Sequence, residues 1–200
     1  MNLKDNFTSK NEIRHFFDHP LATLQLSKAL LEWIPNEKEI IVLCIGTDRS
    51  TGDSLGPLVG TLLSEKKPKH LSIYGTLDQP VHAINLKEKI EMINANHQNP
   101  YVIALDACLG KLKSIGSIIT APSPIQPGAA LKKDLPDVGD AHITGVVNIS
   151  GFMEFQVLQN TRLHIVMQMA RTITGTLYKV DREISFLKTN TMLNTKKSLL

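Results

Sequence analysis

Short apolar runs alternate with helix-like stretches along most of the chain. The run from Glu39 to Ile45 is almost wholly apolar, is rich in Ile and Val, and is bounded by Gly46. Such a run is typical of a strand that is buried on both faces of a parallel sheet. By the same criteria, further strands are expected over Leu71–Tyr74, Tyr101–Leu105, Ile115–Ala121 and Ile143–Ile149.

Four stretches between and beyond these runs carry helical signals. The first begins at Asp18, an N-cap candidate followed by Pro20 in the first turn, and ends before Pro35. In the last, apolar residues recur at a spacing of three to four from about Asn160 to Val180, which predicts a long amphipathic helix. The other two are expected over Pro57–Lys66 and Ala83–Asn94. Strands that alternate with helices predict an α/β fold in which helices cover both faces of a mostly parallel sheet.

The chain length of 200 residues suits one compact domain. We expect residues 1–10 and 189–200 to be flexible, because polar residues dilute their few apolar ones. Residues 122–139 are expected to form a Pro- and Gly-rich loop, and a loop of that length in a compact domain is usually functional or mobile.

Composition and charge exclude several classes of protein. Hydrophobic residues make up 42% of the chain and charged residues 20%, which excludes a wholly disordered, collagen-like or coiled-coil protein. The net charge of +3 comes from scattered basic residues, so no nucleic-acid partner is expected. No apolar run approaches the roughly 18 residues of a membrane span, and the first residues lack a signal-peptide core. These features favour a cytoplasmic protein without a membrane partner. Cys44 and Cys108 form no disulfide framework and are expected to be buried, reduced thiols.

Polar residues gather where the strands are expected to end, and ligands and catalytic groups collect there in such sheets. The loop after the first strand contains Gly46, Gly52 and Gly56, whose spacing matches neither a Walker loop nor a dinucleotide fingerprint. In the same loop, Asp53 has two interpretations that the sequence leaves open. It is either the N-cap of the following helix or, if that helix starts at Pro57, a loop carboxylate that needs a functional reason.

A second carboxylate, Asp106, follows the apolar run 101–105 and is expected at the carboxyl end of an inner strand. It either caps a turn or faces Asp53 across the crevice. Two carboxylates within hydrogen-bonding distance cannot both ionise cheaply, so such a pair can supply a general base and a general acid to a water that attacks an amide. His142 ends the Pro- and Gly-rich loop, and with the two aspartates it would also make a site for a divalent metal such as Ni or Zn. Cys108 is interpreted as a packed side chain rather than a nucleophile.

Three segments of the chain resemble the germination protease of spore-forming bacteria, and in particular its short relatives, the YyaC family of sporulation proteins. They are residues 45–48 with 52–57, residues 104–107 and residues 123–128. The resemblance covers roughly residues 24–184 and extends to the hydrogenase maturation proteases, which share the fold. It implies a three-layer α/β/α domain with a mostly parallel sheet, of the phosphorylase/hydrolase-like type.

The resemblance also implies an activity. Germination protease is an atypical aspartic endopeptidase whose two catalytic aspartates lie in a D-x-L-G-P and a D-A motif, and Asp53 and Asp106 match those positions. In the maturation proteases an acid, an Asp and a later His bind a metal that identifies the substrate, and the matching positions are Asp53, Asp106 and His142. We therefore expect a sporulation-associated endopeptidase that acts on a protein or peptide substrate in the forespore or the mother cell. Its catalytic residues would be Asp53, Asp106 and His142, without a cofactor.

Two other functions remain open. In the first, the chain is a metal-binding processing protein in which Asp53, Asp106 and His142 hold one Ni or Zn ion. In the second, it is a catalytically silent sporulation protein whose crevice binds a peptide or a partner. The long C-terminal helix packs either within the chain or in a homo-oligomer, and its periodicity does not distinguish the two.

Overall fold

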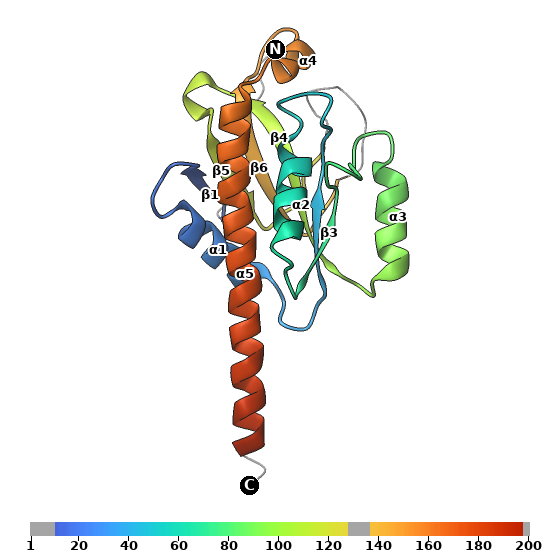
Figure 1. Ribbon diagram of the computed structural model, residues 1–200, viewed down its shortest axis with the longest axis vertical. Coiled ribbons are helices and arrows are strands. Elements are labelled where there is room, and N and C mark those ends of the chain that lie inside the picture. The colour runs from blue at the N-terminus through green and yellow to red at the C-terminus, as the bar shows by residue number, and fades with distance from the viewer. Residues whose placement is uncertain (1–10, 128–136, 198–200) are drawn as a thin grey trace.

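The computed structural model describes residues 11–127 and 137–197, with side chains up to residue 190. In this part of the chain the elements follow the order shown in Figure 1. They are β1 (Ile13–Phe16), α1 (Ala22–Trp33), β2 (Ile40–Cys44), α2 (Leu55–Glu65), β3 (Leu71–Tyr74), α3 (Leu86–Asn96), β4 (Tyr101–Gly110), the 3-10 turn η1 (Leu112–Ser114), β5 (Ser117–Ala121), β6 (Ala141–Ile149), α4 (Glu154–Gln159) and α5 (Leu163–Lys197).

One sheet of six strands, in the order β1-β5-β6-β4-β2-β3, organises these described residues. Strands β3, β2, β4 and β6 are parallel neighbours, and β5 and β1 continue the sheet in antiparallel pairs. The carboxyl ends of the four parallel strands therefore lie along one edge. In register, Cys44 of β2 pairs with Leu105 of β4, and Asp106 of β4 pairs with Thr144 of β6. The predicted mostly parallel α/β sheet is confirmed.

Helices cover the two faces of this sheet unequally and give the protein three layers (Figure 1). Helices α1, α2 and α5 pack on one face, where Val42 and Cys44 of β2 join the larger core cluster. Because side chains of a strand alternate between faces, Ile41 and Leu43 point to the other side and pack with Leu86 of α3. Among the described helices α3 covers this second face, over β2 and β3.

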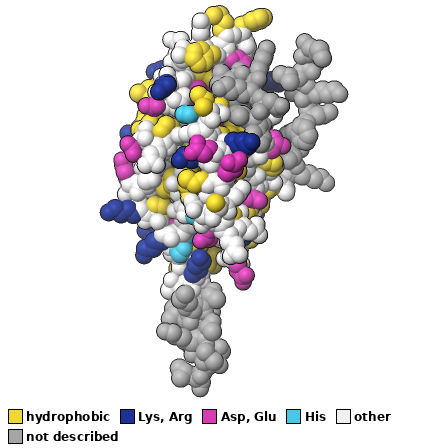
Figure 2. All heavy atoms as spheres, turned by 90° about the vertical axis from the view of Figure 1, so that its right-hand side faces the viewer, with side chains coloured by type: hydrophobic (Ala, Val, Ile, Leu, Met, Phe, Trp, Pro, Cys, Tyr) yellow, Lys and Arg dark blue, Asp and Glu magenta, His cyan; other side chains and the backbone are white. Residues whose placement is uncertain are grey.

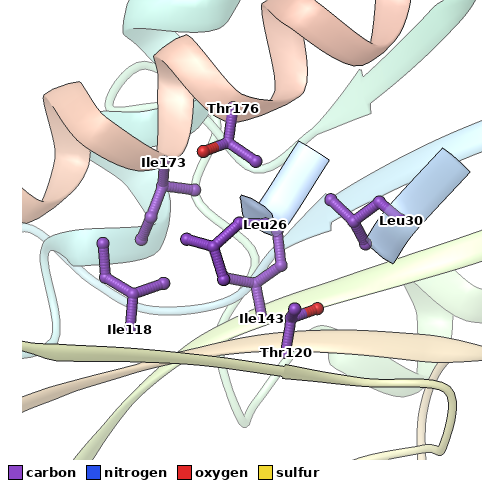
Figure 3. Close-up of a pocket in the computed structure, with 7 residues that line it drawn as sticks. All are labelled: Leu26, Leu30, Ile118, Thr120, Ile143, Ile173 and Thr176. Carbon is purple, nitrogen blue, oxygen red and sulfur yellow. The ribbon is translucent and has the colours of Figure 1, made fainter. Parts of the chain in front are cut away.

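Figure 3 shows how closely α1 and α5 pack on the sheet. Two of the side chains in this contact carry hydroxyls, and both donate to main-chain carbonyls: Thr120 to His142, and Thr176 to Thr172. The void between these side chains has no room for a water molecule, so the contact is dry. The residues that line it are Leu26, Leu30, Ile118, Thr120, Ile143, Ile173 and Thr176.

The strands differ from the sequence-based prediction at several points. β5 begins at Ser117 instead of Ile115, and β6 begins at Ala141 instead of Ile143, so His142 lies within the strand and not at the end of the loop. β1 was not predicted, because four residues with an alternating burial pattern carry too short a signal. β4 was expected to end at Leu105 but continues to Gly110, since it pairs with β6 along this extension. Asp106 therefore lies within a strand and not in a turn, which corrects its interpretation as a turn cap.

The helices differ mainly at their ends. α1 begins at Ala22, so the prediction of Asp18 as its N-cap is wrong. α3 begins at Leu86 instead of Ala83, and the short helix α4 was not predicted. α5 continues to Lys197, past the expected start of a flexible tail at residue 189, because no Gly or Pro interrupts that stretch. Residues 1–10 and the middle of the 122–139 loop lie outside the described residues.

No helix in the described ranges combines the length and the apolar character that crossing a membrane demands.

A buried carboxylate connects the longest described helix, α5, to the residues just before β3. Asp181 is 3% exposed, and its Oδ1 accepts the backbone N–H groups of Lys69 (2.9 Å) and His70 (2.7 Å). The His70 ring also contacts the hydroxyl of Ser185 (2.9 Å), which donates to the Asp181 carbonyl.

We predict that Asp181→Ala lowers the free energy of unfolding by about 1–2 kcal/mol, because two backbone N–H groups lose their acceptor. Urea denaturation measures the change. The matched control is Glu183→Ala on the same helix, which removes a partly exposed ion pair with Lys179 and should cost less than about 1 kcal/mol. Equal losses in the two variants would contradict an anchoring role for Asp181.

Candidate functional site

Asp53, Asp106 and His142 come from three neighbouring parallel strands at the centre of the sheet. Asp53 lies in the loop after β2, Asp106 lies in β4, and His142 lies near the start of β6. His142 pairs with Ala104, two residues before Asp106, so the side chains of His142 and Asp106 point to the same face of the sheet. The fold therefore places Asp106 and His142 on one face of two neighbouring strands, and Asp53 in the loop at the carboxyl end of the strand beside them.

The loop that carries Asp53 folds back over the end of β2. The Gly46 N–H donates to the Val81 carbonyl (2.8 Å), and the Thr47 N–H donates to the Asp53 carbonyl (3.1 Å). Gly46 has a φ of +147°, and a Cβ atom there would collide with the Asp53 carbonyl oxygen. Only glycine permits this approach. On its other side the loop is fixed to α4, because the Gly52 N–H donates to a carbonyl of that helix, 2.8 Å away.

Asp53 is a loop residue and not the N-cap of α2. The helix begins at Leu55, two residues before the expected start at Pro57, and Ser54 occupies the N-cap position. The Ser54 hydroxyl donates to the Thr51 carbonyl (2.7 Å) and makes no cap bond. Pro57 is tolerated inside the first turn because the first four N–H groups of a helix have no acceptor within it. Of the two interpretations that the sequence left open, the structure supports the loop carboxylate.

The surroundings of Asp53 favour its protonated form. Burial raises the pKa of the Asp53 carboxyl above its ordinary value, and a hydrogen bond from Ser50 partly offsets this by lowering the pKa. The Ser50 hydroxyl is itself buried and makes no hydrogen bond of regular geometry, so we regard its contact with Asp53 as a loose one. Asp53 therefore keeps its proton to a higher pH than an exposed aspartate.

Asp106 influences a cysteine on the same face of β4. Its Oδ1 accepts the N–H of Ala107 (2.8 Å). Burial first, and the charge of Asp106 second, raise the pKa of the Cys108 thiol to about 12. Burial likewise raises the pKa of Cys44 to about 12. Both thiols are free, Cys44 is buried as predicted, and Cys108 is only partly so. Neither ionises near neutral pH, so neither is an activated nucleophile.

A hydrogen bond to the segment of residues 122–127 fixes the tautomer of His142. Its Nδ1 lies 2.7 Å from the Ser123 carbonyl, which can only accept, so Nδ1 carries the hydrogen and the lone pair is on Nε2. Burial lowers the pKa of His142, although the Ser123 carbonyl and the charge of Glu12 raise it. The ring is therefore neutral at physiological pH, and its Nε2 can act as an acceptor, a base or a metal ligand.

The half of this face that α3 does not cover is polar. Beside Asp106 and His142 it receives an ion pair from β1, in which Arg14 donates to Glu12 (3.1 Å). Arg14 lies close enough to Cys108 to lower its pKa, which places the guanidinium over the same part of the sheet. The exposed half-face therefore combines carboxylates, a guanidinium and an imidazole.

Asp53, Asp106 and His142 have suitable donor atoms for a metal ion, but the described structure contains no preformed metal site. Two carboxylates and a neutral imidazole suit Ni or Zn. Within residues 11–127 and 137–190, however, no three or more His, Cys, Asp and Glu side chains are placed together so that they could hold a metal ion. Asp53, Asp106 and His142 are therefore not a preformed chelate in this structure.

The sequence analysis missed two polar groups at the same edge. Val81 forms a parallel bridge with Ile45, which places the next residue, His82, beside the Asp53 loop. In the described residues, buried side-chain atoms without a hydrogen-bond partner occur on Ser50, His82 (Nδ1) and Thr174. Such atoms are rare and often mark functional sites. Ser50 lies within the glycine-punctuated loop that was singled out, whereas an isolated His82 carries no sequence signal.

Comparisons with known proteins agree with this architecture. Residues 14–176 match a family model described as "Protein of unknown function (DUF1256)". The chain is 50% identical over 180 residues to the uncharacterized protein YyaC of Bacillus subtilis (strain 168), covering 88% of each. Its fold is similar to the crystal structure of the NiFe hydrogenase maturation protease HycI from Thermococcus kodakarensis KOD1, with a TM-score of 0.53 and 17% identity over 76% of this chain and 98% of that one.

These findings confirm the resemblance to the YyaC family and the three-layer α/β/α fold of the maturation proteases. At 17% identity, the likeness to the maturation protease shows the fold alone. The likeness to germination protease and the roles of Asp53, Asp106 and His142 stay predictions.

The raised pKa of Asp53 predicts a pH-dependent cost to stability. As the pH rises above 3.8, the ordinary pKa, the unfolded chain loses this proton while the native protein still holds it, so Asp53 lowers stability as the pH rises. Asp53→Asn removes that cost. In urea denaturation we expect its stability relative to wild type to increase from pH 4 to pH 7.

The control for this experiment is Asp48→Asn, an exposed position of the same loop. Its stability relative to wild type should be the same at both pH values. If the Asp53→Asn and wild-type proteins kept a constant difference across this range, the Asp53 carboxyl would not have the environment described here.

Proposed function

The chain belongs to the DUF1256 family of proteins of unknown function, and we propose that it is an endopeptidase that hydrolyses a protein substrate with Asp53 and Asp106. The observation that carries the proposal is the position of Asp53. This partly buried carboxyl, with a raised pKa, is fixed at the end of β2, the strand beside the one that carries Asp106. The fold, which is also that of a maturation protease, supports it. A role in sporulation follows from the resemblance to sporulation proteins and belongs to the same proposal.

The two aspartates have surroundings that suit different roles. Burial raises the pKa of Asp53 and favours its protonated form, so we assign it the role of general acid. Asp106, whose Oδ1 accepts the Ala107 N–H, is assigned the role of general base. Asp106 takes one proton from a water molecule whose oxygen bonds to the scissile carbonyl carbon. Asp53 then gives its proton to the leaving nitrogen as the C–N bond breaks, and the pair exchanges one proton to restore the starting state.

His142 has a supporting role in this mechanism. Its Nδ1–H bond to the Ser123 carbonyl fixes the beginning of the 122–127 segment against β6. Ile125 of this segment packs on the apolar cluster of the same face, which includes Ala104, the residue that pairs with His142. His142 therefore shapes the mouth of the site, and its neutral ring adds no positive charge that would favour loss of the Asp53 proton.

The test is cleavage of a pool of peptides and small spore-type proteins, followed by mass spectrometry between pH 5 and pH 7.5. Asp53→Asn and Asp106→Asn should each lower the rate by about 100-fold or more, the usual contribution of a general acid or base. Wild-type activity should fall as the pH rises, because the acid role requires protonated Asp53. Asp48→Asn should keep full activity.

An Asp106→Asn protein that cleaved at the wild-type rate would remove this mechanism. If the wild-type protein cut nothing under any condition, the chain would be a catalytically silent protein that binds a peptide or a partner, which is the remaining alternative.

A second candidate function is metal-dependent processing, and the hydrogen bond of His142 favours it. Histidines that ligate metals usually donate their other ring N–H to a carbonyl or carboxylate, as His142 does to Ser123. In this candidate, Asp53, Asp106 and His142 would bind one Ni or Zn ion, which would polarise the substrate carbonyl or mark the substrate. The side chains would have to draw closer together than they lie here.

Calorimetric titration of the untagged protein with Ni²⁺ and with Zn²⁺ tests this candidate. It predicts binding of about one ion, with an affinity at least 10-fold weaker in His142→Ala. His164→Ala changes an exposed histidine near the start of α5 and should have no effect. Equal binding by both variants, or no binding by wild type, would count against a metal site at these residues.

A further inference from the structure

Exposed apolar side chains gather around α4. The Ser150 N–H donates to the Gly110 carbonyl (2.8 Å), which brings the turn before α4 beside η1. Phe152 in this turn is 97% exposed, so it packs on nothing in the described fold. Figure 2 shows hydrophobic side chains at the end of the molecule that carries α4 in Figure 1. We name this group the α4 surface, and it consists of Leu112, Ile149, Phe152, Met153 and Phe155.

The α4 surface is joined directly to the loop that carries Asp53. The Gly52 N–H donates to the Leu158 carbonyl at the end of α4, and a Cβ atom on Gly52 would come within 2.8 Å of the Leu158 side chain. On the other side, the Asn148 amide donates to the Val157 carbonyl (3.3 Å). α4 is therefore packed between β6 and the Asp53 loop, and its exposed residues lie at the carboxyl edge of the sheet.

Neither core packing nor backbone conformation accounts for the presence of large apolar residues in the turn before α4. Met153 has a φ of +59°, a left-handed conformation that costs a non-glycine residue on the order of 1 kcal/mol, yet its side chain is exposed. Glycine would relieve this strain without loss of packing. Contiguous exposed apolar residues of this kind mark sites of protein interaction.

Basic residues surround the α4 surface. Arg49 of the Asp53 loop, Lys113 of η1 and Arg162 in the turn between α4 and α5 are exposed, and none has an ion-pair partner among the described residues. The acidic residues in the same segments are the exposed Asp48 and the half-buried Asp53 and Glu154. Among the fully exposed side chains of these segments, Arg49, Lys113 and Arg162 outnumber Asp48, so the rim carries more positive than negative charge.

We propose that the α4 surface binds an extended segment of the protein substrate that carries large apolar side chains and acidic residues. The proposal rests on the proposed function, because the same substrate would then enter the adjoining site with Asp53. The charge of the rim disfavours a second copy of this chain as the occupant. A two-fold symmetric contact would set one basic rim against the other, and like charges that meet across an interface weaken it.

The experiment measures binding without cleavage, in the Asp53→Asn/Asp106→Asn background. The probe is a fluorescein-labelled 12-residue peptide in which Leu and Phe alternate with Glu, and the matched peptide has Lys in place of Glu. Fluorescence anisotropy gives the two affinities. We expect the Glu peptide to bind at least 10-fold more tightly than the Lys peptide, and its affinity to fall as the salt concentration rises.

Variants at exposed positions localise the contact. Phe152→Ser/Phe155→Ser should weaken binding of the Glu peptide at least 10-fold, and Lys113→Glu/Arg162→Glu should do the same. The matched control is Phe186→Ser/Leu187→Ser, which removes two exposed apolar residues of α5 and should change nothing. Circular dichroism confirms that each variant is folded.

Three results would overturn the proposal. They are no binding of the Glu peptide to the wild-type surface, equal binding by the Phe152→Ser/Phe155→Ser variant, and self-association in light scattering that this variant abolishes. The last would assign the surface to a second copy. Binding is measured with both aspartates replaced, so it does not depend on catalysis. If this variant bound the peptide while the wild-type protein cleaved nothing, the proposed function would be refuted and the binding proposal would stand.

Discussion

The close approach of the Asp53 carbonyl to Gly46 is the contact on which the rest of the site depends. A side chain at Gly46 would collide with that carbonyl, and a side chain at Gly56 would collide with the carbonyl of Ile45. Two glycines thus let the loop return onto β2 and let α2 start against the same strand. Their spacing superficially suggests a phosphate-binding loop, but their physical role is close packing of backbone on backbone. This packing holds Asp53 out of water far enough to raise its pKa.

The unequal covering of the sheet explains where the remaining polar groups lie. Helices α1, α2 and α5 cover one face with the larger core cluster. On the other face α3 covers β2 and β3, and Asp106 and His142 occupy the half beyond it. Asp106, Cys108 and His142 are partly buried, and burial lowers the pKa of His142 and keeps Cys108 a thiol. Fold and electrostatics therefore point to one region of the molecule.

Sequence patterns predicted the parallel strands well because a strand buried on both faces is a continuous apolar run, as in β2. They predicted the ends of elements less well. The extension of β4 through Asp106 depends on pairing with β6, which lies more than 30 residues later in the chain, and no local pattern records it. The start of α2 at Leu55 depends on the packing of Gly56 against Ile45. Hydrophobic periodicity and capping residues are local signals, and they cannot reveal contacts between segments that are distant in the sequence.

The candidate site was predictable to a similar degree. Asp106 could be found because it follows an apolar run, Asp53 because it lies in a glycine-punctuated loop before a helix, and His142 because it follows a Pro- and Gly-rich stretch. The tautomer of His142, the looseness of the Ser50 contact and the orphaned nitrogen of His82 all depend on three-dimensional neighbours. The exposed residues around α4 were equally hidden, since Phe152 and Phe155 in a sequence normally indicate a core.

The most direct test of the central claim is to incubate candidate protein substrates with this protein in ¹⁸O-labelled water and to examine every new carboxyl terminus by mass spectrometry. Hydrolysis by an activated water molecule places one labelled oxygen in each new terminus. The account predicts labelled termini with the wild-type protein and none with Asp53→Asn/Asp106→Asn. Labelled termini at equal abundance in both samples would show that the two aspartates do not catalyse peptide hydrolysis.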